Sequence, residues 1–286
     1  MNATKTMRAG VVGWPIGQSL SPAMHGYWIS EYGLNAEYLP LAVSPEEFPA
    51  AILSLAAKGY RGVNVTIPHK EAAYKLSATL DEDARVTGAV NLLIFEDQKT
   101  HGKKIHGRNT DVLGFSSALK EALGDEAARR GPCVVLGAGG AARAIIVALV
   151  RSGAEEIRIL NRTRARATAT AASLGSSQLK IFDWGDWHAA FADAGLLVNT
   201  TSLGMTGKNK LDISLDALPV TAGVSDIVYN PLQTELLGAA LARGQRTMDG
   251  LGMLMHQAVP AFEAWFGVRP IVSAALRANL EAKLNG

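Results

Sequence analysis

A glycine-rich segment between an apolar run and a helical pattern constrains the fold of this chain more than any other feature. Residues 133–143 read CVVLGAGGAAR, in which Gly137, Gly139 and Ala142 occupy the three positions of a GxGxxG/A pattern. In a strand–turn–helix unit of this kind, the first glycine allows a tight turn and the second lets the backbone approach a pyrophosphate. The small third residue lets the helix pack closely on the strand. A glycine turn without a ligand is the alternative, but the flanking strand and helix patterns favour a dinucleotide-binding Rossmann unit.

The turn after the next predicted strand indicates which dinucleotide binds. A site for NAD requires Asp or Glu about 20 residues beyond the glycine motif, to accept hydrogen bonds from the ribose 2′-hydroxyl. This chain instead reads NRTRAR at residues 161–166, with no carboxylate. Arg162, together with Arg164 or Arg166, can neutralise a 2′-phosphate through charge-assisted hydrogen bonds, which predicts NADP. The alternative is a solvated helix start, where arginines are less usual because the helix dipole is positive there.

Two series of alternating strand and helix patterns predict an α/β fold. In the first series, the helices begin at Pro22, at a capping box over residues 44–47 and at Pro68. The predicted strands of this series are residues 8–12, 36–43, 61–66, 89–95 and 103–106, the last two joined as a hairpin across residues 96–102. Strands separated by helices imply βαβ units and a mostly parallel sheet.

A second sheet is predicted to start at Cys133. Its strands are predicted at residues 133–136, 157–160, 196–199 and 224–228, and its helices end near Ser152, Leu174 and Arg243. The last stretch, residues 250–286, holds two helical patterns separated by Gly267 and Pro270. The length of 286 residues allows one large domain or two modest ones, and a chain of this length buries enough surface to need no disulfide or metal.

The composition excludes several classes of protein. Hydrophobic residues make up 48% and charged residues 19% of the chain, which excludes disorder. The net charge of +2 gives no sign of a nucleic-acid or polybasic membrane surface. The single cysteine, Cys133, excludes a disulfide framework, and the six histidines show no metal-binding spacing. No apolar run approaches the roughly 20 residues of a membrane span and no signal core is present, so we expect a soluble cytoplasmic protein.

Polar residues suited to binding a small molecule cluster in the first half of the chain. Ser19 and Ser21 are two residues apart, so in an extended segment their side chains point the same way and can hold a carboxylate or a diol. Ser21, which precedes Pro22, is alternatively the N-cap of a helix. Asn64 and Thr66 share one face of a predicted strand end.

Three further residues are candidates for chemistry. Lys70 lies on the first turn of a predicted helix, where the helix dipole disfavours a protonated amine; this suits a general acid or base, and a plain surface lysine is the alternative. Asp111 stands at the start of another predicted helix. Its carboxylate either caps that helix or pairs with Lys70. Asn91 lies in an apolar strand pattern, where its amide needs a hydrogen-bond partner.

Polar segments in the second half follow two predicted strands and open the C-terminal helix. These segments are NTTSLGM at residues 199–205, DIVYNP at residues 226–231 and DGLGML at residues 249–254, with His256 and Gln257 one turn further on. Ligands of open α/β sheets bind at the carboxyl ends of the strands, so these segments are candidate binding loops.

Taken in order, the motifs resemble those of the shikimate dehydrogenase family over nearly the whole chain. The motifs that carry the resemblance are Ser19-x-Ser21, Asn64-Val-Thr66-x-Pro-x-Lys70, Gly88-Ala-Val-Asn91, Asn109-Thr-Asp111, Gly137-Ala-Gly-Gly-Ala, Asn161-Arg-Thr163, Tyr229-Asn-Pro and Gly250-Leu-Gly-Met253 with Gln257. The resemblance implies an α/β substrate domain made of residues 1–111 plus 250–286, a Rossmann NADP-binding domain made of residues 112–249, and a ligand cleft between them. Two residues depart from the family pattern: Leu92 stands where Thr is usual, and His256 stands where Tyr or a bulky apolar residue is usual.

The resemblance also implies a role for each matched residue. Lys70 is implied as the catalytic acid and base, and Asp111 as its partner. The implied substrate contacts are Ser19, Ser21, Asn64, Thr66, Lys70, Asn91, Asp111, Tyr229 and Gln257, with the two serines on the substrate carboxylate. The implied cofactor contacts are Glu82, Gly137, Ala138, Gly139, Gly140, Ala141, Asn161, Arg162, Thr163, Arg166, Ile227, Gly250 and Met253. No metal is expected.

The activity that the resemblance implies is the reversible NADP-dependent reduction of 3-dehydroshikimate to shikimate, in the biosynthesis of chorismate and the aromatic amino acids. One alternative is the related quinate/shikimate type of enzyme with broader substrate and NAD use, against which the arginine-rich turn argues. A second alternative is a non-catalytic NADP-binding regulator, which would not need Lys70 or Asp111. The expected partner is a small-molecule substrate, with no nucleic acid and no membrane, bound by a monomer or a homodimer.

Overall fold

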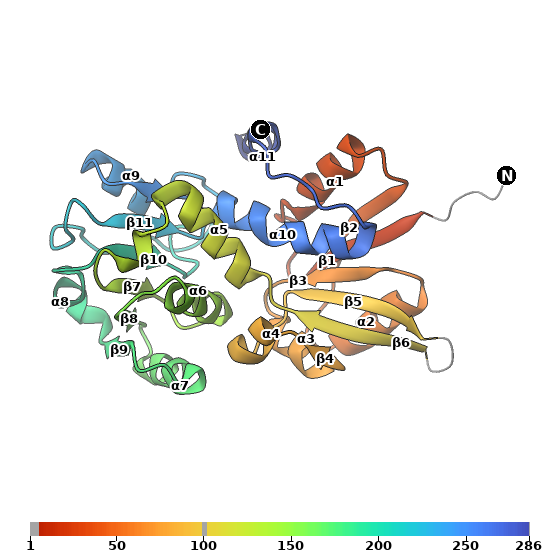
Figure 1. The fold of residues 1–286 in the computed structure, drawn as a ribbon, viewed down its shortest axis with the longest axis horizontal. Helices are drawn as coiled ribbons and strands as arrows, with labels where there is room; N and C mark the ends of the chain where they lie inside the picture. Colours follow the sequence, from red (N-terminus) through yellow and green to blue (C-terminus); the bar gives the residue numbers. More distant parts are fainter. Residues whose placement is uncertain (1–5, 99–101, 286) are drawn as a thin grey trace. The chain divides into compact units, whose positions relative to one another are not determined.

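The chain forms two compact units in the computed structural model, which describes residues 6–98 and 102–285 (Figure 1). The first unit holds the described residues up to Thr110 together with Gln257–Lys283, and the second holds Asp111–His256 with the last described residues. Within the described residues, each unit contains a six-stranded sheet. The predicted two-domain α/β fold is therefore confirmed. The predicted domain bounds remain a prediction, since by packing alone Asp111 and residues 250–256 belong to the second unit.

The sheet of the first unit is mixed rather than mostly parallel. Its strands, in spatial order, are β2 (Ala36–Ala42), β1 (Met7–Gly13), β3 (Gly62–Val65), β5 (Leu92–Gln98), β6 (Gly102–Arg108) and β4 (Thr79–Leu80). The predicted hairpin is confirmed as the antiparallel pair β5–β6, and its turn at residues 99–101 lies outside the described residues. Because β5 also pairs antiparallel with β3, the hairpin interrupts a sheet that is parallel from β2 to β3.

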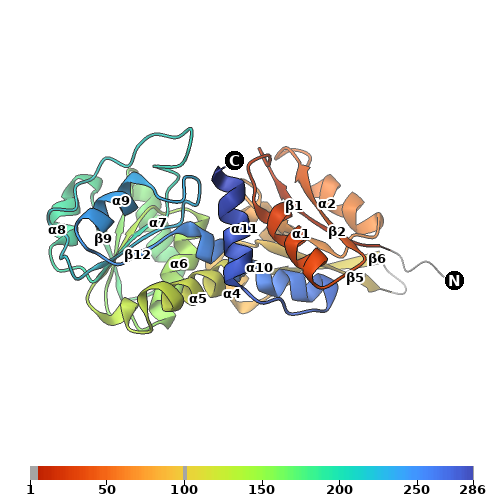
Figure 2. The same cartoon turned by 90° about the horizontal axis from the view of Figure 1, so that it is seen from above.

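Helices cover both faces of the first sheet. On one face, α2 (Phe48–Ala57) and α3 (Lys70–Leu76) contribute to a buried cluster with alternate residues of β1, β3, β5 and β6. The opposite face carries α1 (Ser21–Glu31), which packs along β1 and β2 in Figure 2, and the second half of α10 (Gly250–Phe266). The indole N–H of Trp265 on α10 donates to the Leu93 carbonyl at 3.2 Å, which fixes this helix on β5. Two further helices of the described chain are α4 (Glu82–Thr87) and α11 (Ala274–Asn285).

Two helices begin later than the sequence predicts. The capping box at residues 44–47 forms only in part: the Glu47 carboxylate accepts hydrogen bonds from the backbone N–H and the hydroxyl of Ser44, and α2 begins at Phe48. Helix α3 begins at Lys70 rather than at Pro68, because residues 66–69 form a turn closed by the hydrogen bond from His69 N–H to the Thr66 carbonyl.

The sheet of the second unit is parallel throughout its described pairings. Its strands, in spatial order, are β12 (Thr247–Met248), β11 (Gly223–Asp226), β10 (Leu196–Asn199), β7 (Cys133–Leu136), β8 (Ile157–Leu160) and β9 (Leu179–Phe182). From β7 the strand order runs toward β9 on one side and toward β12 on the other. This is the Rossmann arrangement, in which ligands bind where the strand order reverses, at the carboxyl ends of β7 and β10.

Both faces of the second sheet are buried, which explains the continuous apolar runs of its strands. One face packs against α5 (Asp111–Leu123), α6 (Gly140–Arg151) and α7 (Arg164–Leu174). The other face packs against α8 (Trp187–Phe191) and α9 (Glu235–Ala242). Alternate strand residues serve the two faces, as Val135 and Val134 do in β7.

Several short elements were not predicted from the sequence. They are β4, α4, β9, α8 and β12, together with two short 3-10 turns at Ala127–Arg129 and Trp184–Asp186. Strand β11 also ends at Asp226, before the predicted end at residue 228. It ends there because the Asp226 carboxylate accepts the N–H of Val228 at 3.0 Å and turns the backbone away from the sheet.

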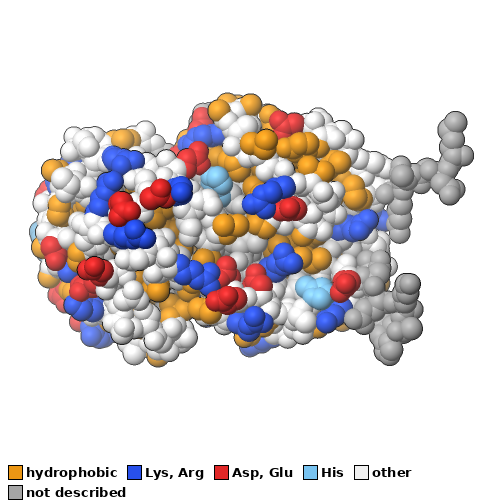
Figure 3. All heavy atoms as spheres, viewed as in Figure 1, with side chains coloured by type: hydrophobic (Ala, Val, Ile, Leu, Met, Phe, Trp, Pro, Cys, Tyr) orange, Lys and Arg blue, Asp and Glu red, His pale blue; other side chains and the backbone are white. Residues whose placement is uncertain are grey.

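The surface of the described residues has no dominant charge. On the face that Figure 3 shows, Lys and Arg side chains alternate with Asp and Glu side chains rather than forming a region of one sign. This mixture agrees with the net charge of +2. Of the helices in residues 6–98 and 102–285, none is long and apolar enough to cross a membrane.

Candidate active site

Gly137 begins the cofactor half of the candidate site, in the second unit. It follows β7 with a φ of +115°, a conformation that side chains rarely adopt. A Cβ atom at this position would also lie 2.5 Å from the Thr200 hydroxyl oxygen, at the end of the neighbouring strand β10. Conformation and space therefore both require glycine here, and the second reason could not be read from the sequence.

The second glycine of the motif, Gly139, is not required by a tight contact within the protein. A Cβ atom at Gly139 or at Gly140 would meet nothing within 4 Å. Gly139 is exposed, stands at the N-cap of α6 and provides no side-chain cap for the first N–H groups of that helix. Ala142, one turn further, is completely buried against the core, as its small size predicts. The start of α6 is therefore uncapped, faces open space and lies at the switch point of a parallel sheet. These three features suit the binding of a pyrophosphate.

The arginine-rich turn lies at the start of α7, next to this motif. Arg162 and Arg166 are exposed, and the Asn161 side chain donates to the Thr163 carbonyl at 2.8 Å. Arg164 pairs with the Asp183 carboxylate at 2.6 Å. Of the two arginines considered as a second phosphate ligand, Arg164 is thus engaged elsewhere, which leaves Arg166 as the better partner of Arg162.

A buried carboxylate organises the loops at the ends of β10 and β11. Asp226 is completely buried and accepts hydrogen bonds from the Asn199 amide (3.0 Å), the Val228 N–H (3.0 Å) and the Thr234 hydroxyl (2.8 Å). Burial raises the pKa of Asp226 above its usual value, and the three hydrogen bonds oppose this shift. The network holds the chain that continues into Ile227 and Tyr229.

Helix α10 begins against this loop. The N–H of Gly250 donates to the Val228 carbonyl at 3.2 Å, and a Cβ atom at Gly250 would overlap the carbonyl of Ile227. Met253, one turn further, is buried in the core of the second unit. The structure therefore brings two predicted cofactor residues, Ile227 and Gly250, into direct contact.

The substrate half of the candidate site, in the first unit, is a chain of buried polar side chains. The Tyr38 hydroxyl donates to Asn64 Oδ1 at 2.7 Å, and Asn64 Nδ2 donates to the Asn91 carbonyl at 3.2 Å. Asn91 Nδ2 donates to the Thr110 hydroxyl at 3.0 Å and to Gln257 Oε1 at 3.3 Å, while Asn91 Oδ1 accepts the Thr110 N–H at 2.8 Å. All five residues are buried. The prediction that Asn91 needs partners is confirmed.

The predicted serines lie at the start of α1. The N-cap position belongs to Leu20, and Ser21 is the first helical residue, so the alternative that Ser21 caps the helix is wrong. The Ser21 N–H donates to the Ser19 hydroxyl oxygen at 3.3 Å. Thr66 is half-buried after β3 and packs against Gly13, where a Cβ atom would lie 2.5 Å from the Thr66 methyl group.

The two predicted catalytic residues begin helices in different units. Lys70 is the half-buried first residue of α3, and its carbonyl accepts the Val90 N–H at 3.0 Å next to Asn91. Asp111 is the buried first residue of α5 and directly follows Thr110 of the polar chain. Glu82, a predicted cofactor contact, is the exposed first residue of α4 in the first unit.

Sequence reasoning missed Tyr38 and Thr110 in the polar chain. Tyr38 lies in strand β2, where an aromatic residue indicates ordinary core packing. The only signal that could have singled it out is its chemistry, because a buried tyrosine hydroxyl needs a hydrogen-bond partner. Thr110 was part of the quoted Asn109-Thr-Asp111 motif but was given no role of its own.

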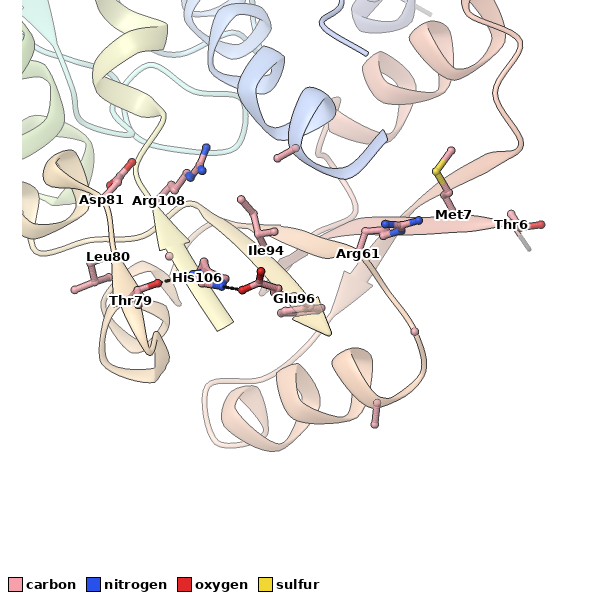
Figure 4. A pocket seen from close by; sticks show the side chains of 15 residues that line it. Thr6, Met7, Arg61, Thr79, Leu80, Asp81, Ile94, Glu96, His106 and Arg108 are labelled. Carbon is pink, nitrogen blue, oxygen red and sulfur yellow. Dashed lines mark hydrogen bonds and ion pairs between the residues drawn. The ribbon is translucent and has the colours of Figure 1, made fainter. Parts of the chain in front are cut away.

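A cavity of about 980 Å³ in the first unit lies away from these residues (Figure 4). Its lining includes residues of β4, β5 and β6 together with Met7 of β1, Arg61 and Ala264 of α10, and none of the predicted site residues contributes to it. The Thr79 hydroxyl lies 2.5 Å from His106 Nδ1, and His106 Nε2 lies 2.7 Å from the Glu96 carboxylate. These contacts join β4 to the hairpin at the sheet edge. The part of the chain that the structure describes holds no cluster of three His, Cys, Asp or Glu side chains suited to a metal ion.

One unit holds a parallel Rossmann sheet with a glycine-rich switch point, and the other holds a buried polar network; this combination is typical of a two-domain dinucleotide-dependent oxidoreductase. Family models agree: residues 11–93 match "Shikimate dehydrogenase substrate binding domain", residues 120–206 match "Shikimate / quinate 5-dehydrogenase" and residues 250–278 match "Shikimate 5'-dehydrogenase C-terminal domain". The chain belongs to the shikimate dehydrogenase family, an oxidoreductase family.

Individual relatives cover almost the whole chain. It is 50% identical over 274 residues to "Shikimate dehydrogenase (NADP(+))" of Paramagnetospirillum magneticum, covering 96% of this chain and 98% of that protein. It is 51% identical over 284 residues to the protein of the same name from Methylocella silvestris, covering 99% of each.

Solved structures agree in fold. The shikimate 5-dehydrogenase of Thermus thermophilus in complex with NADP(H) and shikimate has a TM-score of 0.83 at 34% identity, over 98% of this chain and 99% of that one. The quinate dehydrogenase of Corynebacterium glutamicum in complex with NAD has a TM-score of 0.86 at 29% identity, over 98% and 99% of the two chains.

Proposed function

We propose that this chain catalyses the reversible, NADP-dependent reduction of 3-dehydroshikimate to shikimate, as a step in the biosynthesis of chorismate and the aromatic amino acids. The observation that carries the proposal is the 50% identity, over 96% of the chain, to a relative named for shikimate and NADP(+). The arginine-rich turn without a carboxylate supports NADP as the cofactor independently.

Most of the proposed cofactor contacts lie in the second unit, and Glu82 lies in the first. The glycine segment from Gly137 to Ala141 binds the pyrophosphate through backbone N–H groups at the start of α6. Arg162 and Arg166 bind the adenosine 2′-phosphate, with Asn161 and Thr163 beside them. The nicotinamide end is contacted by Glu82, Ile227, Gly250 and Met253. NADPH, when bound, supplies the hydride that reduces the C3 carbonyl of the substrate.

The substrate contacts follow mainly from the first unit. Ser19 and Ser21 hold the carboxylate through their hydroxyl groups. Amides and hydroxyls bind the ring hydroxyls of the substrate; these groups belong to Asn64, Thr66, Asn91, Tyr229 and Gln257. Because most of these groups are already fixed by hydrogen bonds or burial, little side-chain freedom is lost when the substrate binds.

Lys70 and Asp111 move the proton that accompanies hydride transfer. In the reducing direction the Lys70 ammonium donates a proton to the oxygen of the C3 carbonyl, and in the oxidising direction the neutral amine takes it back. Asp111 holds the Lys70 side chain in place by charge and hydrogen bonding. We propose that residues 1–111 plus 250–286 act as the substrate domain and residues 112–249 as the cofactor domain, so that the reaction needs both.

A second candidate function is that of a quinate/shikimate dehydrogenase with NAD use. The observation that supports this second candidate is the fold similarity to the quinate dehydrogenase of Corynebacterium glutamicum. A non-catalytic NADP-binding regulator is disfavoured because Lys70 and Asp111 are both present. A cytoplasmic location and a monomeric or homodimeric state remain predictions.

The deciding experiment measures absorbance at 340 nm with purified protein and four combinations: shikimate or quinate, each with NADP⁺ or NAD⁺. Rapid turnover with shikimate and NADP⁺ alone is the expected result. Comparable turnover of quinate or with NAD⁺ would assign the chain to the quinate/shikimate type. No turnover in any combination would refute the enzymatic proposal.

A further inference from the structure

Tyr38 lies at one end of the buried polar chain of the first unit. Its side chain is 7% exposed, and its hydroxyl donates to Asn64 Oδ1 at 2.7 Å. Ser21 also hydrogen-bonds the same hydroxyl. The Tyr38 hydroxyl thus contacts two side chains, Ser21 and Asn64, that the proposed function names as substrate contacts. Tyr38 itself has no role in that proposal.

We propose that Tyr38 is a positioning residue for substrate binding, and that its hydroxyl fixes the orientation of the Asn64 side-chain amide. The inference rests on the proposed function, since Asn64 is a substrate contact only in that proposal.

The geometry around Asn64 gives the amide one favourable orientation. Its oxygen accepts from the Tyr38 hydroxyl and its nitrogen donates to the Asn91 carbonyl at 3.2 Å. Rotating the amide by 180° would place the Asn64 oxygen against the Asn91 carbonyl oxygen, where two acceptors repel each other. The same rotation would place the Asn64 N–H group against the Tyr38 hydroxyl, whose own proton would lose its acceptor. Without the tyrosine hydroxyl, only the bond to Asn91 would oppose that rotation.

The orientation is passed on to further proposed substrate contacts. Asn64 is bonded to the carbonyl of Asn91, whose own amide is bonded to Thr110 and to Gln257. A change at Asn64 therefore reaches groups from three separate segments of the chain. Buried networks of this kind behave as a unit, because each hydrogen bond restricts the next.

An aromatic stack keeps the Tyr38 ring in place. The His25 ring lies parallel to it, with the ring centroids 3.9 Å apart and an interplanar angle of 1°. His25 is itself completely buried between Trp28, Phe262 and Trp265. Burial lowers the pKa of His25 to about 3, so the ring that supports Tyr38 is neutral at physiological pH. Burial likewise raises the pKa of Tyr38, so its hydroxyl remains a donor.

The test compares Tyr38→Phe with wild type in the shikimate and NADP⁺ assay. The phenylalanine retains the stacked ring and removes only the hydroxyl. We expect the KM for shikimate to rise about 5- to 10-fold, the size of effect that follows from losing one buried hydrogen bond, with kcat within threefold and the KM for NADP⁺ unchanged. Tyr60→Phe is the matched control, because Tyr60 is 6% exposed in the same unit and belongs to the core cluster on the other sheet face. It should leave all three constants unchanged.

A double-mutant cycle separates positioning from general loss of structure. If Tyr38 acts through Asn64, Tyr38→Phe should have less than a twofold further effect on kcat/KM in an Asn64→Ala background. Independent, multiplying effects of the two changes would overturn the proposal. So would an unchanged shikimate KM in Tyr38→Phe, or a variant that does not fold. The wild-type protein is assayed first, before any variant is made. Absence of wild-type turnover would refute the proposed function, whereas the variant results above, measured as ratios to an active wild type, would refute only the role of Tyr38.

Discussion

The first residue of α10, Gly250, lies directly against the carbonyl of Ile227 at the end of β11. A Cβ atom on Gly250 would overlap this carbonyl and would also crowd the Val228 carbonyl carbon at 2.8 Å. Both neighbours are backbone atoms, which cannot turn aside as a side chain would. This contact fixes where α10 starts relative to the loop that carries the proposed nicotinamide contact Ile227.

We expect Gly250→Ala to destabilise the protein and to weaken NADP binding. Overpacking against backbone costs about 3 kcal/mol, which lowers the melting temperature of a protein of this size by about 6–12 °C. Thermal unfolding with and without NADP⁺ measures both effects. Gly238→Ala is the control: its Cβ would meet only the Gln233 side chain at 3.5 Å, and alanine favours helix α9, so the melting temperature should hold or rise. An unchanged melting temperature in Gly250→Ala would contradict the contact.

His25 should make the protein sensitive to acid. Burial lowers the pKa of His25 from 6.5 to about 3, so between these values the unfolded chain binds a proton that the folded chain does not. The stabilising effect of the neutral ring is complete above pH 6.5 and is lost as the pH falls toward 3. From pH 7 to pH 5 this group alone lowers the free energy of unfolding by about 2 kcal/mol.

Denaturant unfolding of His25→Leu at pH 7 and pH 5 tests this expectation. The variant should lose about 2 kcal/mol less than wild type over that interval, whatever its stability at pH 7. His188→Leu, which changes an exposed histidine, should keep the wild-type difference. Equal losses in His25→Leu and wild type would mean that His25 is protonated, or solvated, in the folded state.

Arg162 should determine the preference for NADP over NAD. We expect Arg162→Ala to raise the KM for NADP⁺ at least 10-fold and to leave the KM for NAD⁺ within threefold, because only NADP carries the 2′-phosphate. Arg164→Ala is the control in the same turn, since the Arg164 guanidinium pairs with Asp183 at 2.6 Å, and it should change the NADP⁺ KM less than threefold. If Arg162→Ala raised both KM values equally, the arginine would not be reading the phosphate.

Lys70 should be needed for turnover rather than for binding. Removing a general acid and base lowers kcat by roughly 100-fold or more, so we expect that loss in Lys70→Ala, with a smaller change in the KM for shikimate. Lys75→Ala changes an exposed lysine on the same helix, α3, and should retain wild-type kcat. A kcat within threefold of wild type in Lys70→Ala would remove Lys70 from the catalytic role.

The second unit was the easier one to predict, because its signals are local. The strand, the glycine turn and the helix at residues 133–151 follow one another along the chain, and periodicity and glycine positions identify all three. The contact that makes Gly137 indispensable is different: Thr200 comes from another strand, and no pattern near Gly137 indicates it.

The substrate half depended more on contacts between distant segments. Asn91 was recognised as needing a partner, but Thr110 and Gln257 become its partners only through the fold. Tyr38 was missed because a tyrosine in a strand is usually a core residue. The mixed order of the first sheet was also missed, because a hairpin pattern does not reveal that β5 pairs with β3 as well.

The first unit is assembled from both ends of the chain, and this sets an order for its folding during synthesis. Asn91 bonds to Gln257, 166 residues later, and Trp28 bonds to Ile271, 243 residues later. Residues 111–256, in contrast, contain all six strands of the second sheet in one stretch. On the ribosome, the nucleotide-binding sheet is therefore complete before the C-terminal helices emerge. The substrate half stays unfinished until Gln257 and Ile271 have been synthesised, so chains that stop before Gln257 gain the nucleotide-binding sheet without the polar chain that closes on Gln257.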